Sequence, residues 1–326
     1  MRILVTGGAG FIGSHFVREL IAGAYGLTGS DVIVVDKLTY AGNLANLTPV
    51  AGHPAMRFVR GDICDAALMN DVMRGVDLVV HFAAESHVDR SITDADAFVR
   101  TNVAGTHTLL TAACVAGVGR FVHVSTDEVY GSIETGAWTE DYPLEPNSPY
   151  SASKAASDLM VRAFHVTHGL DTCITRASNN YGPYQFPEKV IPLFVTNLLE
   201  GATVPLYGDG RNVRDWLHVA DHCRGVALVA EHGRAGEVYN IGGGTPLTNR
   251  QLTETLLEIM GKDWSMVRQV ADRKGHDFRY DLDYGKATAE VGYRPATTLK
   301  SGLAATVQWY KDNAAWWQPL KPARVE

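Results

Sequence analysis

Apolar and polar residues follow two different spacings along the first half of the chain. Short, mostly apolar runs, typical of buried strands, occur at 2–6, 32–36, 56–60, 78–83, 120–125 and 172–176. Between several of them, apolar residues recur at the spacing of amphipathic helices, at 11–22, 98–116 and 150–168. Because nearly continuous apolar strands alternate with helices, we expect a parallel sheet covered on both faces, an α/β doubly wound (Rossmann) fold.

The pattern changes after Ser178. A segment rich in Pro, Gly and Tyr, 179–187, is followed by shorter and less regular elements. We therefore predict two domains, a Rossmann domain at 1–178 and a smaller α/β domain at 179–326. We also expect residues 208–240 to return to the first domain through a strand at 215–219.

Composition and charge limit the function classes. The 326 residues are 46% apolar and 20% charged, which excludes a disordered chain and allows a sizeable core. A net charge of −7 argues against a general nucleic-acid or anionic-membrane surface. Four widely separated cysteines indicate reduced thiols, and neither a leader nor a bilayer-spanning apolar run is evident. We expect a cytoplasmic protein.

The first candidate site is the glycine-rich stretch TGGAGFIG at 6–13, between a strand and a helix. Its spacing fits GxGxxG from Gly8 and also GxxGxxG from Gly7, so the register stays open. Such glycines allow a tight turn and bring helix amides to a pyrophosphate, although similar turns also occur where a helix simply packs closely on a strand. Asp36 ends the next strand, about twenty residues beyond the last glycine, where an acid binds a ribose diol and repels a 2′-phosphate. The stretch predicts NAD rather than NADP.

The second candidate pair is Tyr150 and Lys154, four residues apart at the start of a predicted helix. This spacing places the phenol and the ammonium on one helix face, where the cation favours the phenolate. The pKa of a phenol, about 10, must be lowered by roughly three units for it to act as a base near neutrality. We expect Lys154 and a positively charged nicotinamide to supply this lowering together. The alternative interpretation is an ordinary solvated helix face.

The third candidate is the cluster Thr126, Asp127 and Glu128, directly after the predicted strand at 120–125. Two adjacent carboxylates at a buried strand end can work as an acid and a base if their pKa values differ. Taken alone, an Asp-Glu pair there is more often a solvated turn or a helix cap.

Together, the glycine turn, Asp36 and the Tyr150–Lys154 pair resemble the extended short-chain dehydrogenase/reductase superfamily. Within it, the chain resembles the dTDP-glucose 4,6-dehydratases over essentially its whole length, through the stretches DKLTYAGN (36–43), HFAAESHVDRS (81–91), STDEVYG (125–131) and DRKGHD (272–277). The resemblance implies NAD in the first domain, a nucleotide-sugar in the second, and an enzyme that starts a deoxysugar pathway.

The resemblance also implies catalytic roles. Tyr150, with Lys154, would take the proton of the sugar 4-hydroxyl while hydride leaves carbon 4 for NAD. Glu128 would then remove the carbon 5 proton, and Asp127 would protonate the departing 6-hydroxyl. The same hydride would return to carbon 6, and Thr126 would hydrogen-bond the oxygen on carbon 4.

Binding residues are assigned on the same resemblance. We assign NAD contacts to Gly7, Gly10, Phe11, Ile12, Gly13, Asp36, Lys37, Thr39, Gly42, Asp62, Ile63, Ala83, Ala84, Ser86, Thr101, Tyr150 and Lys154. We assign substrate contacts to Ser86, Thr126, Asn179, Glu188, Lys189, Arg214, Asn249, Arg273 and His276.

The stretches 98–116 and 159–168 carry apolar residues on more than the one face needed to cover a sheet. Relatives of this kind pair these helices into a dimeric four-helix bundle, so we expect a homodimer. The alternative is that the extra apolar residues pack inside the monomer.

Other functions were weighed. His218 and His222 are four apart, but His218 falls in a predicted strand, so we predict no metal site. A non-enzymatic dinucleotide sensor would typically lack Tyr150 and Lys154. A nucleotide-sugar 4-epimerase or decarboxylase does not need the Asp127–Glu128 pair for elimination. The sequence does not identify the nucleoside with certainty.

Overall fold

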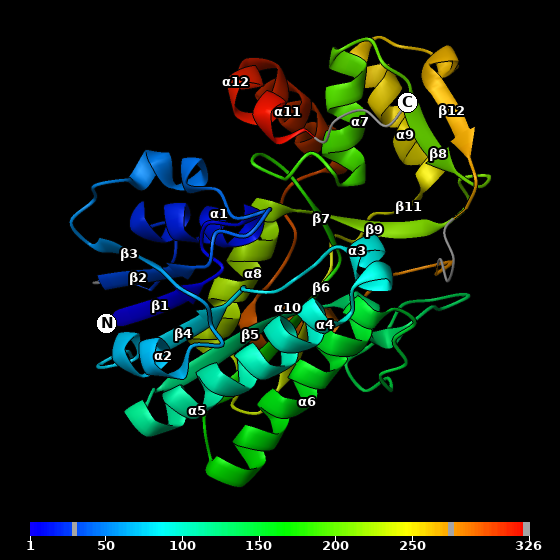
Figure 1. The fold of residues 1–326 in the computed structure, drawn as a ribbon. Coiled ribbons are helices and arrows are strands. Elements are labelled where there is room, and N and C mark those ends of the chain that lie inside the picture. Colours follow the sequence, from blue (N-terminus) through cyan, green and yellow to red (C-terminus); the bar gives the residue numbers. More distant parts are fainter. Residues whose placement is uncertain (28–30, 273–276, 322–326) are drawn as a thin grey trace.

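The computed structural model of the protein describes residues 1–27, 31–272 and 277–321. Within these residues, the centre is a sheet of seven parallel strands in the order β10-β6-β5-β4-β1-β2-β3 (Figure 1). The strands are β1 Arg2–Thr6, β2 Asp31–Asp36, β3 Met56–Arg60, β4 Leu78–His81, β5 Arg120–Thr126, β6 Thr172–Ala177 and β10 Val238–Ile241. The predicted doubly wound parallel sheet is confirmed.

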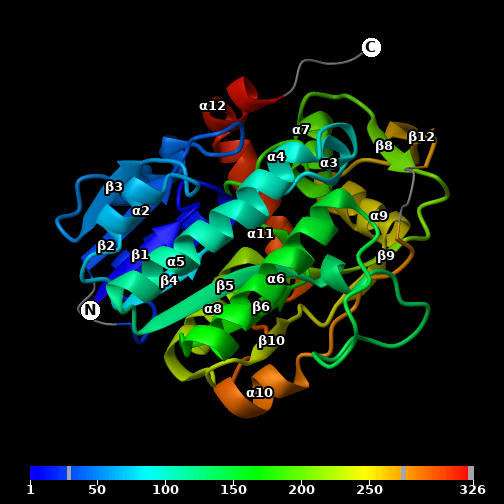
Figure 2. The ribbon, with the colours of Figure 1, turned by 60° about the horizontal axis from the view of Figure 1, so that its bottom comes forward.

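Helices cover both faces of this sheet (Figures 1 and 2). One face packs against α1 Phe11–Ile21, α8 Val219–His232 and α10 Gly285–Val291. The other packs against α2 Ala66–Val72, α5 Thr106–Ala116 and α6 Pro149–His168. In β1, Ile3 and Val5 belong to the first core and Leu4 to the second, which explains why the strands read as continuous apolar runs.

The helix predicted at 98–116 is interrupted in its hydrogen bonding. It consists of α4 Asp96–Phe98, a π-helical segment Val99–Gly105 (η2) and α5. The remaining short helices of this half are η1 Leu44–Val50, α3 Val88–Thr93 and η3 Asp127–Tyr130.

Helix α6 begins at a well-defined cap, which fixes the position of Tyr150 in its first turn. Ser148 Oγ accepts a hydrogen bond from the Ser151 amide (3.1 Å), and Ser151 Oγ accepts one from the Ser148 amide (3.0 Å). Pro149 occupies the first helical position, where its missing N–H costs nothing. Gly169 ends the helix in the left-handed region (φ 69°).

The second part of the chain forms its own small sheets and core. Strands β7 Asn179–Tyr181, β9 Val213–His218 and β11 Pro246–Thr248 make a three-stranded sheet, and β8 Val204–Tyr207 pairs with β12 Val267–Val270. A separate apolar cluster joins them to α7 Val190–Leu199, α9 Asn249–Met260, α11 Leu299–Asp312 and α12 Ala314–Trp317. The short helices η4 Trp264–Met266 and η5 Gln318–Leu320 complete this part.

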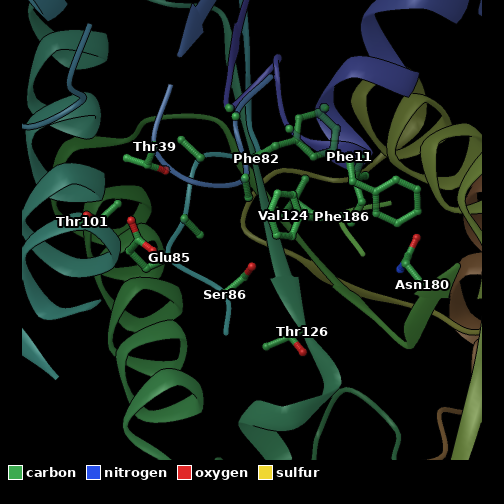
Figure 3. Close-up of a pocket in the computed structure, with 18 of the residues that line it drawn as sticks. Phe11, Thr39, Phe82, Glu85, Ser86, Thr101, Val124, Thr126, Asn180 and Phe186 are labelled. Atoms are coloured by element: carbon green, nitrogen blue, oxygen red, sulfur yellow. The ribbon is translucent and has the colours of Figure 1, made fainter. Parts of the chain in front are cut away.

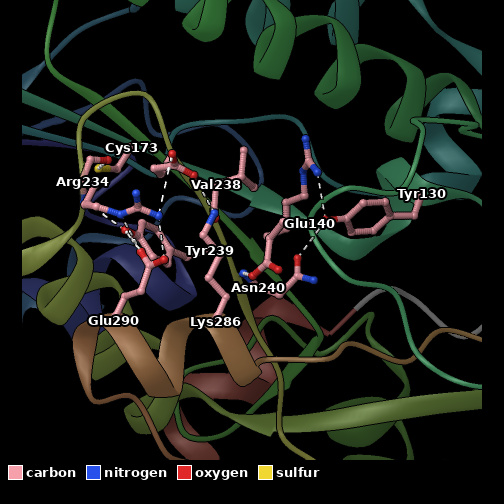
Figure 4. A network of polar contacts seen from close by, with 11 residues as sticks. Tyr130, Glu140, Cys173, Arg234, Val238, Tyr239, Asn240, Lys286 and Glu290 are labelled. Carbon is pink, nitrogen blue, oxygen red and sulfur yellow. Dashed lines mark hydrogen bonds and ion pairs between the residues drawn. The ribbon is translucent and has the colours of Figure 1, made fainter.

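The chain returns to the central sheet differently from the prediction. The strand expected at 215–219 is β9, which lies in the three-stranded sheet, so the prediction that it joins the central sheet is wrong. Instead β10 pairs with β6, and polar contacts hold it there (Figure 4). The Asn240 amide donates to Glu140 (2.7 Å), Tyr130 donates to Asn240 Oδ1 (2.9 Å), and Lys286 donates to the Val238 carbonyl (2.8 Å).

The C-terminal helices contact the glycine turn of the first half. Trp316 Nε1 donates to Asn46 Oδ1 (3.0 Å), and Asn46 Nδ2 donates to the Ala9 carbonyl inside the turn (2.9 Å). Arg18 of α1 lies over the ring of Tyr184, 4.3 Å from its centre. The two parts of the chain therefore meet directly beside the predicted cofactor site.

Among the described residues, none of the helices has the length and apolar character needed to cross a membrane.

Candidate active site

A cavity of about 320 Å³ lies at the carboxyl ends of the central strands (Figure 3). Its walls come from the loops after β1, β2, β4 and β5, and from the segment around β7 in the second part. Ligands of open parallel sheets bind at this edge, because the loops after neighbouring strands converge there. Every residue that we assigned to the cofactor, and every catalytic candidate, lines this one cavity.

The structure shows which of the two glycine patterns faces the cavity. Gly7 has φ +69°, and a Cβ there would lie 2.6 Å from the Ala83 amide nitrogen. A Cβ on Gly13 would lie 2.3 Å from the Gly7 carbonyl oxygen. Gly7, Gly10 and Gly13 line the cavity, whereas Gly8 faces the side chain of Val34. The pattern counted from Gly7 is therefore the one that faces the cavity.

The amino end of α1 opens into the same cavity. Its N-cap is Gly10, which has no side chain to bond the first amides of the helix, and Phe11 and Ile12 line the cavity. Unpaired amides at a helix amino end attract a pyrophosphate. Gly7 and Gly13 permit a ligand to approach the backbone closely, and the amino end of α1 offers amides to its phosphates. This part of the cavity therefore fits a dinucleotide.

Asp36 is held rigidly at the end of β2. Its Oδ2 accepts a hydrogen bond from the Ala9 amide (2.9 Å) and its Oδ1 accepts one from the Leu38 amide (2.8 Å). Burial raises the pKa of this carboxyl, while these two amides oppose the rise. A Cβ on Gly42 would lie 2.7 Å from Asp36 Oδ1, so the loop can close over the carboxylate only with glycine there. Each oxygen keeps capacity for a further hydrogen bond from a ribose diol.

The two carboxylates lie where the buried strand β5 ends. Strand β5 ends at Thr126, and η3 then brings Asp127 and Glu128 to the cavity wall. Asp127 is 1% exposed, and its Oδ1 accepts a hydrogen bond from Thr126 Oγ1 (3.2 Å). Its Oδ2 is buried with no hydrogen-bond partner among the described residues. A solvated turn is excluded for Asp127.

The two acids differ in their surroundings. Burial, the Glu128 charge and the Asp215 charge raise the pKa of Asp127 well above its usual range, and Arg214 and Thr126 only partly oppose this rise. A raised pKa favours the protonated form of Asp127. Glu128 is more exposed than Asp127, and its amide donates to Thr126 Oγ1 (3.3 Å).

Tyr150 and Lys154 lie on α6 and both line the cavity. Burial and the Glu128 charge raise the pKa of the Tyr150 phenol, although a hydrogen bond with Thr126 lowers it. Lys154 donates to the Val124 carbonyl (2.8 Å), and its Nζ lies 3.5 Å from His123 Nε2. Burial lowers the pKa of Lys154 to about 8. Burial is the largest influence on the phenol pKa in this structure. Its lowering by Lys154 together with a positively charged nicotinamide stays a prediction.

The predicted substrate residues divide into three groups. Ser86, Thr126, Asn179, Glu188 and Lys189 line the cavity, and Lys189 Nζ donates to the Ser86 carbonyl (2.9 Å). Arg214 and Asn249 are not part of its wall. Arg214 donates instead to the Asp277 carbonyl (2.9 Å) and lies over the Tyr280 ring, although its charge still acts on Asp127. Arg273 and His276 fall outside the described residues.

Several cavity residues were missed by the sequence analysis. They include Tyr40, Asn180, Gln185 and Phe186, which come from loops and from the start of the second part, and His222 on α8. Asn180 could have been suspected, because it adjoins Asn179 in the predicted site. Phe186 is marked by no periodic pattern, and its ring packs edge-on against Tyr40 at 5.6 Å.

The two histidines weighed as metal ligands have other partners. His218 Nδ1 accepts a hydrogen bond from the Ala220 amide, and His222 Nδ1 is 2.9 Å from Asn180 Oδ1. Within the described ranges, no group of three or more His, Cys, Asp or Glu side chains is arranged to hold a metal.

Comparison with known proteins agrees with this geometry. Residues 4–306 match the family model described as GDP-mannose 4,6 dehydratase. The chain is 61% identical to a dTDP-glucose 4,6-dehydratase of Streptomyces niveus, over 98% of this chain and 96% of that protein. It is 64% identical to the dTDP-glucose 4,6-dehydratase of Streptomyces antibioticus, with the same coverage.

Solved structures give the same result. A dTDP-glucose 4,6-dehydratase of Streptomyces venezuelae, solved with NAD and dTDP bound, has a TM-score of 0.97 at 68% identity, covering 98% of this chain and all of that one. A UDP-glucose 4-epimerase of Thermotoga maritima with UDP-glucose has a TM-score of 0.89 at 35% identity, over 96% of this chain and 100% of that one. The chain belongs to the GDP-mannose 4,6 dehydratase family.

Proposed function

We propose that this protein is an NAD-dependent 4,6-dehydratase of a nucleoside diphosphate hexose, converting dTDP-glucose to dTDP-4-keto-6-deoxyglucose. The observation that carries the proposal is the pair Asp127 and Glu128, placed with Tyr150 in the cavity that the glycine turn borders. The similarity to dTDP-glucose 4,6-dehydratases supports the choice of sugar and nucleoside.

The residues of the cavity have separate tasks in this reaction. Bound NAD would take up the hydride of carbon 4 and deliver it to carbon 6. Tyr150 would accept the proton of the 4-hydroxyl, and the resulting ketone acidifies the hydrogen on carbon 5. Glu128 would remove that hydrogen as a proton, while Asp127 would protonate the departing 6-hydroxyl. The raised pKa of Asp127 suits an acid, and the more exposed Glu128 suits a base.

A 4-epimerase is the second candidate, because the same fold occurs in the UDP-glucose 4-epimerase of Thermotoga maritima. Epimerisation requires no acid and base for elimination, so it would leave Asp127 and Glu128 without a task. Mass spectrometry after incubation with dTDP-glucose separates the two candidates. Loss of one water, with no added reductant, supports the dehydratase, whereas a product of unchanged mass supports the epimerase.

The cofactor site makes a first prediction. Asp36→Ala is expected to weaken NAD binding by about 10- to 100-fold, because the ribose diol loses charge-assisted hydrogen bonds. Titration calorimetry with NAD measures the change. Asp31→Ala is the matched control, since it removes a carboxylate from the other end of β2, where Asp31 pairs with Arg2 at the surface. Equal NAD affinity in the wild type and Asp36→Ala would remove Asp36 from the site.

We further propose that the protein works in the cytoplasm. All four cysteines are unpaired, and Cys173 and Cys223 are buried in the core. Free thiols of this kind persist in a reducing compartment.

We also propose a homodimer formed by α5 and α6. These helices contact each other on one side of the sheet (Figure 2). Both carry exposed apolar side chains. Val115 on α5 is 78% exposed, and Leu159 and Val166 on α6 are 57% and 67% exposed. Covering the same patch on two copies would bring four helices together in a bundle.

Charge substitutions on this patch test the dimer. Leu159→Glu combined with Val166→Glu is expected to yield a monomeric mass by light scattering at micromolar concentration, because burying two carboxylates in an apolar interface is costly. Leu44→Glu is the matched control, since Leu44 is similarly exposed (49%) but lies on η1, which contacts α1 on the opposite face of the sheet. A monomeric wild type would contradict the proposal outright.

A further inference from the structure

We propose that Arg90 is a positioning residue that holds the cofactor side of the cavity against the second part of the chain and thereby slows the release of NAD. We call its contacts with Tyr40 and Glu188 the clasp. The inference rests on the proposed function, because the hydride that leaves carbon 4 must return to carbon 6 of the same sugar. A cofactor that left between these two steps would stop the reaction at the 4-keto hexose.

Three segments of the cavity wall come from distant parts of the chain. They are the loop 37–43 after β2, the loop 82–87 after β4, and the segment 182–189 before α7. The two loops carry residues that we assigned to NAD, and the third segment belongs to the second part of the chain. Because a ligand enclosed by such segments leaves when they move apart, contacts that join them slow its release.

Arg90 joins these segments from outside the cavity. It lies on α3, directly after the loop 82–87, and its own side chain does not line the cavity. Its guanidinium carbon is 3.7 Å from the centre of the Tyr40 ring, and its Nη2 donates to Glu188 Oε2 (3.2 Å). Tyr40 and Glu188 both line the cavity. One side chain therefore connects all three segments.

The surroundings of Glu188 strengthen its contact with Arg90. The Glu188 side chain is 9% exposed, so its carboxylate has lost most of its water and gains from a charged donor. His87 Nε2 lies 3.6 Å from the same oxygen, but burial lowers the pKa of His87, so Arg90 supplies the positive charge near neutral pH. A planar guanidinium can lie over a phenol ring and still donate to a carboxylate at its edge.

Neighbouring contacts close the same side of the cavity. Phe186 packs edge-on against Tyr40 at 5.6 Å, and Lys189 Nζ donates to the Ser86 carbonyl (2.9 Å). The segment before α7 therefore touches both loops directly, and the clasp adds a contact between charged groups. The Arg90 side chain is 48% exposed, so its removal leaves no hole in the core and should loosen the wall without unfolding the protein.

The rate at which NAD leaves tests the clasp without any sugar present. The full-length enzyme is loaded with isotopically labelled NAD and mixed with an excess of unlabelled NAD, and the loss of label is followed. We expect Arg90→Ala to lose the label about 10- to 100-fold faster than the wild type, because a charge-assisted hydrogen bond and a cation–π contact are removed. Arg74→Ala is the matched control and should lose the label at the wild-type rate, since Arg74 pairs with Asp71 (3.3 Å) at the surface beside α2.

A double-mutant cycle distinguishes the clasp from a general loosening of the protein. Tyr40→Leu removes the ring under the guanidinium, whereas Tyr40→Phe keeps it. If Arg90 acts through Tyr40, Arg90→Ala should speed NAD release less in the Tyr40→Leu background than in the wild type, and Tyr40→Phe should preserve most of the effect. Arg90→Lys keeps the charge but loses the planar group, so its release rate should lie between those of the wild type and Arg90→Ala.

Turnover supplies a second readout. Product formation by Arg90→Ala should slow with time and recover when NAD is added, whereas the wild type should need no addition. Equal label loss from the wild type and Arg90→Ala, an equally large effect of Arg74→Ala, or fully additive effects in the cycle would overturn the clasp. The exchange experiment contains no sugar, so it is independent of the proposed dehydration, and failure of that function and failure of the clasp are distinct.

Discussion

Glu128→Gln is expected to oxidise dTDP-glucose at carbon 4 yet fail to eliminate water from it. The amide has the size of the carboxylate but cannot accept the carbon 5 proton, whereas Tyr150 still accepts the proton of the 4-hydroxyl. The 4-keto hexose should accumulate, and loss of water should slow by about 10²- to 10⁴-fold, the range of a general base. Rapid-mixing absorbance of the nicotinamide follows the oxidation. Exchange of the carbon 5 hydrogen in deuterated water follows the proton removal.

Two further variants locate the effect within the reaction. Tyr150→Phe should block the oxidation itself, so neither signal should appear. Glu134→Gln is the matched control, because Glu134 is an exposed carboxylate in the same loop and does not line the cavity. Wild-type exchange of the carbon 5 hydrogen in Glu128→Gln would show that another group is the base.

The parts of the site that could be predicted are those fixed by the ends of regular elements. Gly10 and Gly13 belong to both registers of the strand-turn-helix pattern, and Asp36 and Asp127 follow from the ends of two apolar strands. The carboxyl ends of parallel strands share one edge of a sheet, so these residues had to converge even though they are far apart in sequence.

The parts that could not be predicted depend on tertiary partners. Lys154 does follow Tyr150 by one helical turn, but its ammonium is oriented by the Val124 carbonyl of the neighbouring strand. Arg214 directly precedes the strand predicted at 215–219, yet its guanidinium donates to backbone carbonyls at 213, 277 and 278. No local pattern contains those contacts.

Strand β10 of the central sheet also depends on tertiary partners. Segments 213–218 and 238–241 are both short and both contain apolar residues, so the local pattern does not decide which of them joins the central sheet. Strand β10 joins the central sheet because it pairs with β6. Asn240 of β10 also contacts Tyr130 and Glu140, which are about a hundred residues away in sequence. Local patterns predict the strand at 215–219 but not the one at 238–241, and they contain the sheet partner of neither.

Asp127→Asn is expected to make the enzyme slower and the fold more stable. The amide cannot protonate the departing 6-hydroxyl, so loss of water should slow by about 10²- to 10⁴-fold while oxidation at carbon 4 continues. The gain in stability follows from the raised pKa of Asp127, which burial and the charges of Glu128 and Asp215 cause. The folded protein binds this proton more tightly than the unfolded chain, whose Asp has a pKa of about 3.9.

The raised pKa of Asp127 in the folded state determines how the stability of the wild type changes with pH. Below the unfolded pKa both states hold the proton, and Asp127 carries no ionisation cost. As the pH rises from there through the raised pKa of the folded state, the unfolded chain ionises more readily and the wild type loses stability. Asparagine does not ionise, so the gap in thermal midpoint between Asp127→Asn and the wild type should widen with pH. Asp141→Asn, an exposed position on the following loop, is the control. A gap that stays constant from acid to neutral pH would mean that Asp127 does not enter the reaction as the protonated acid.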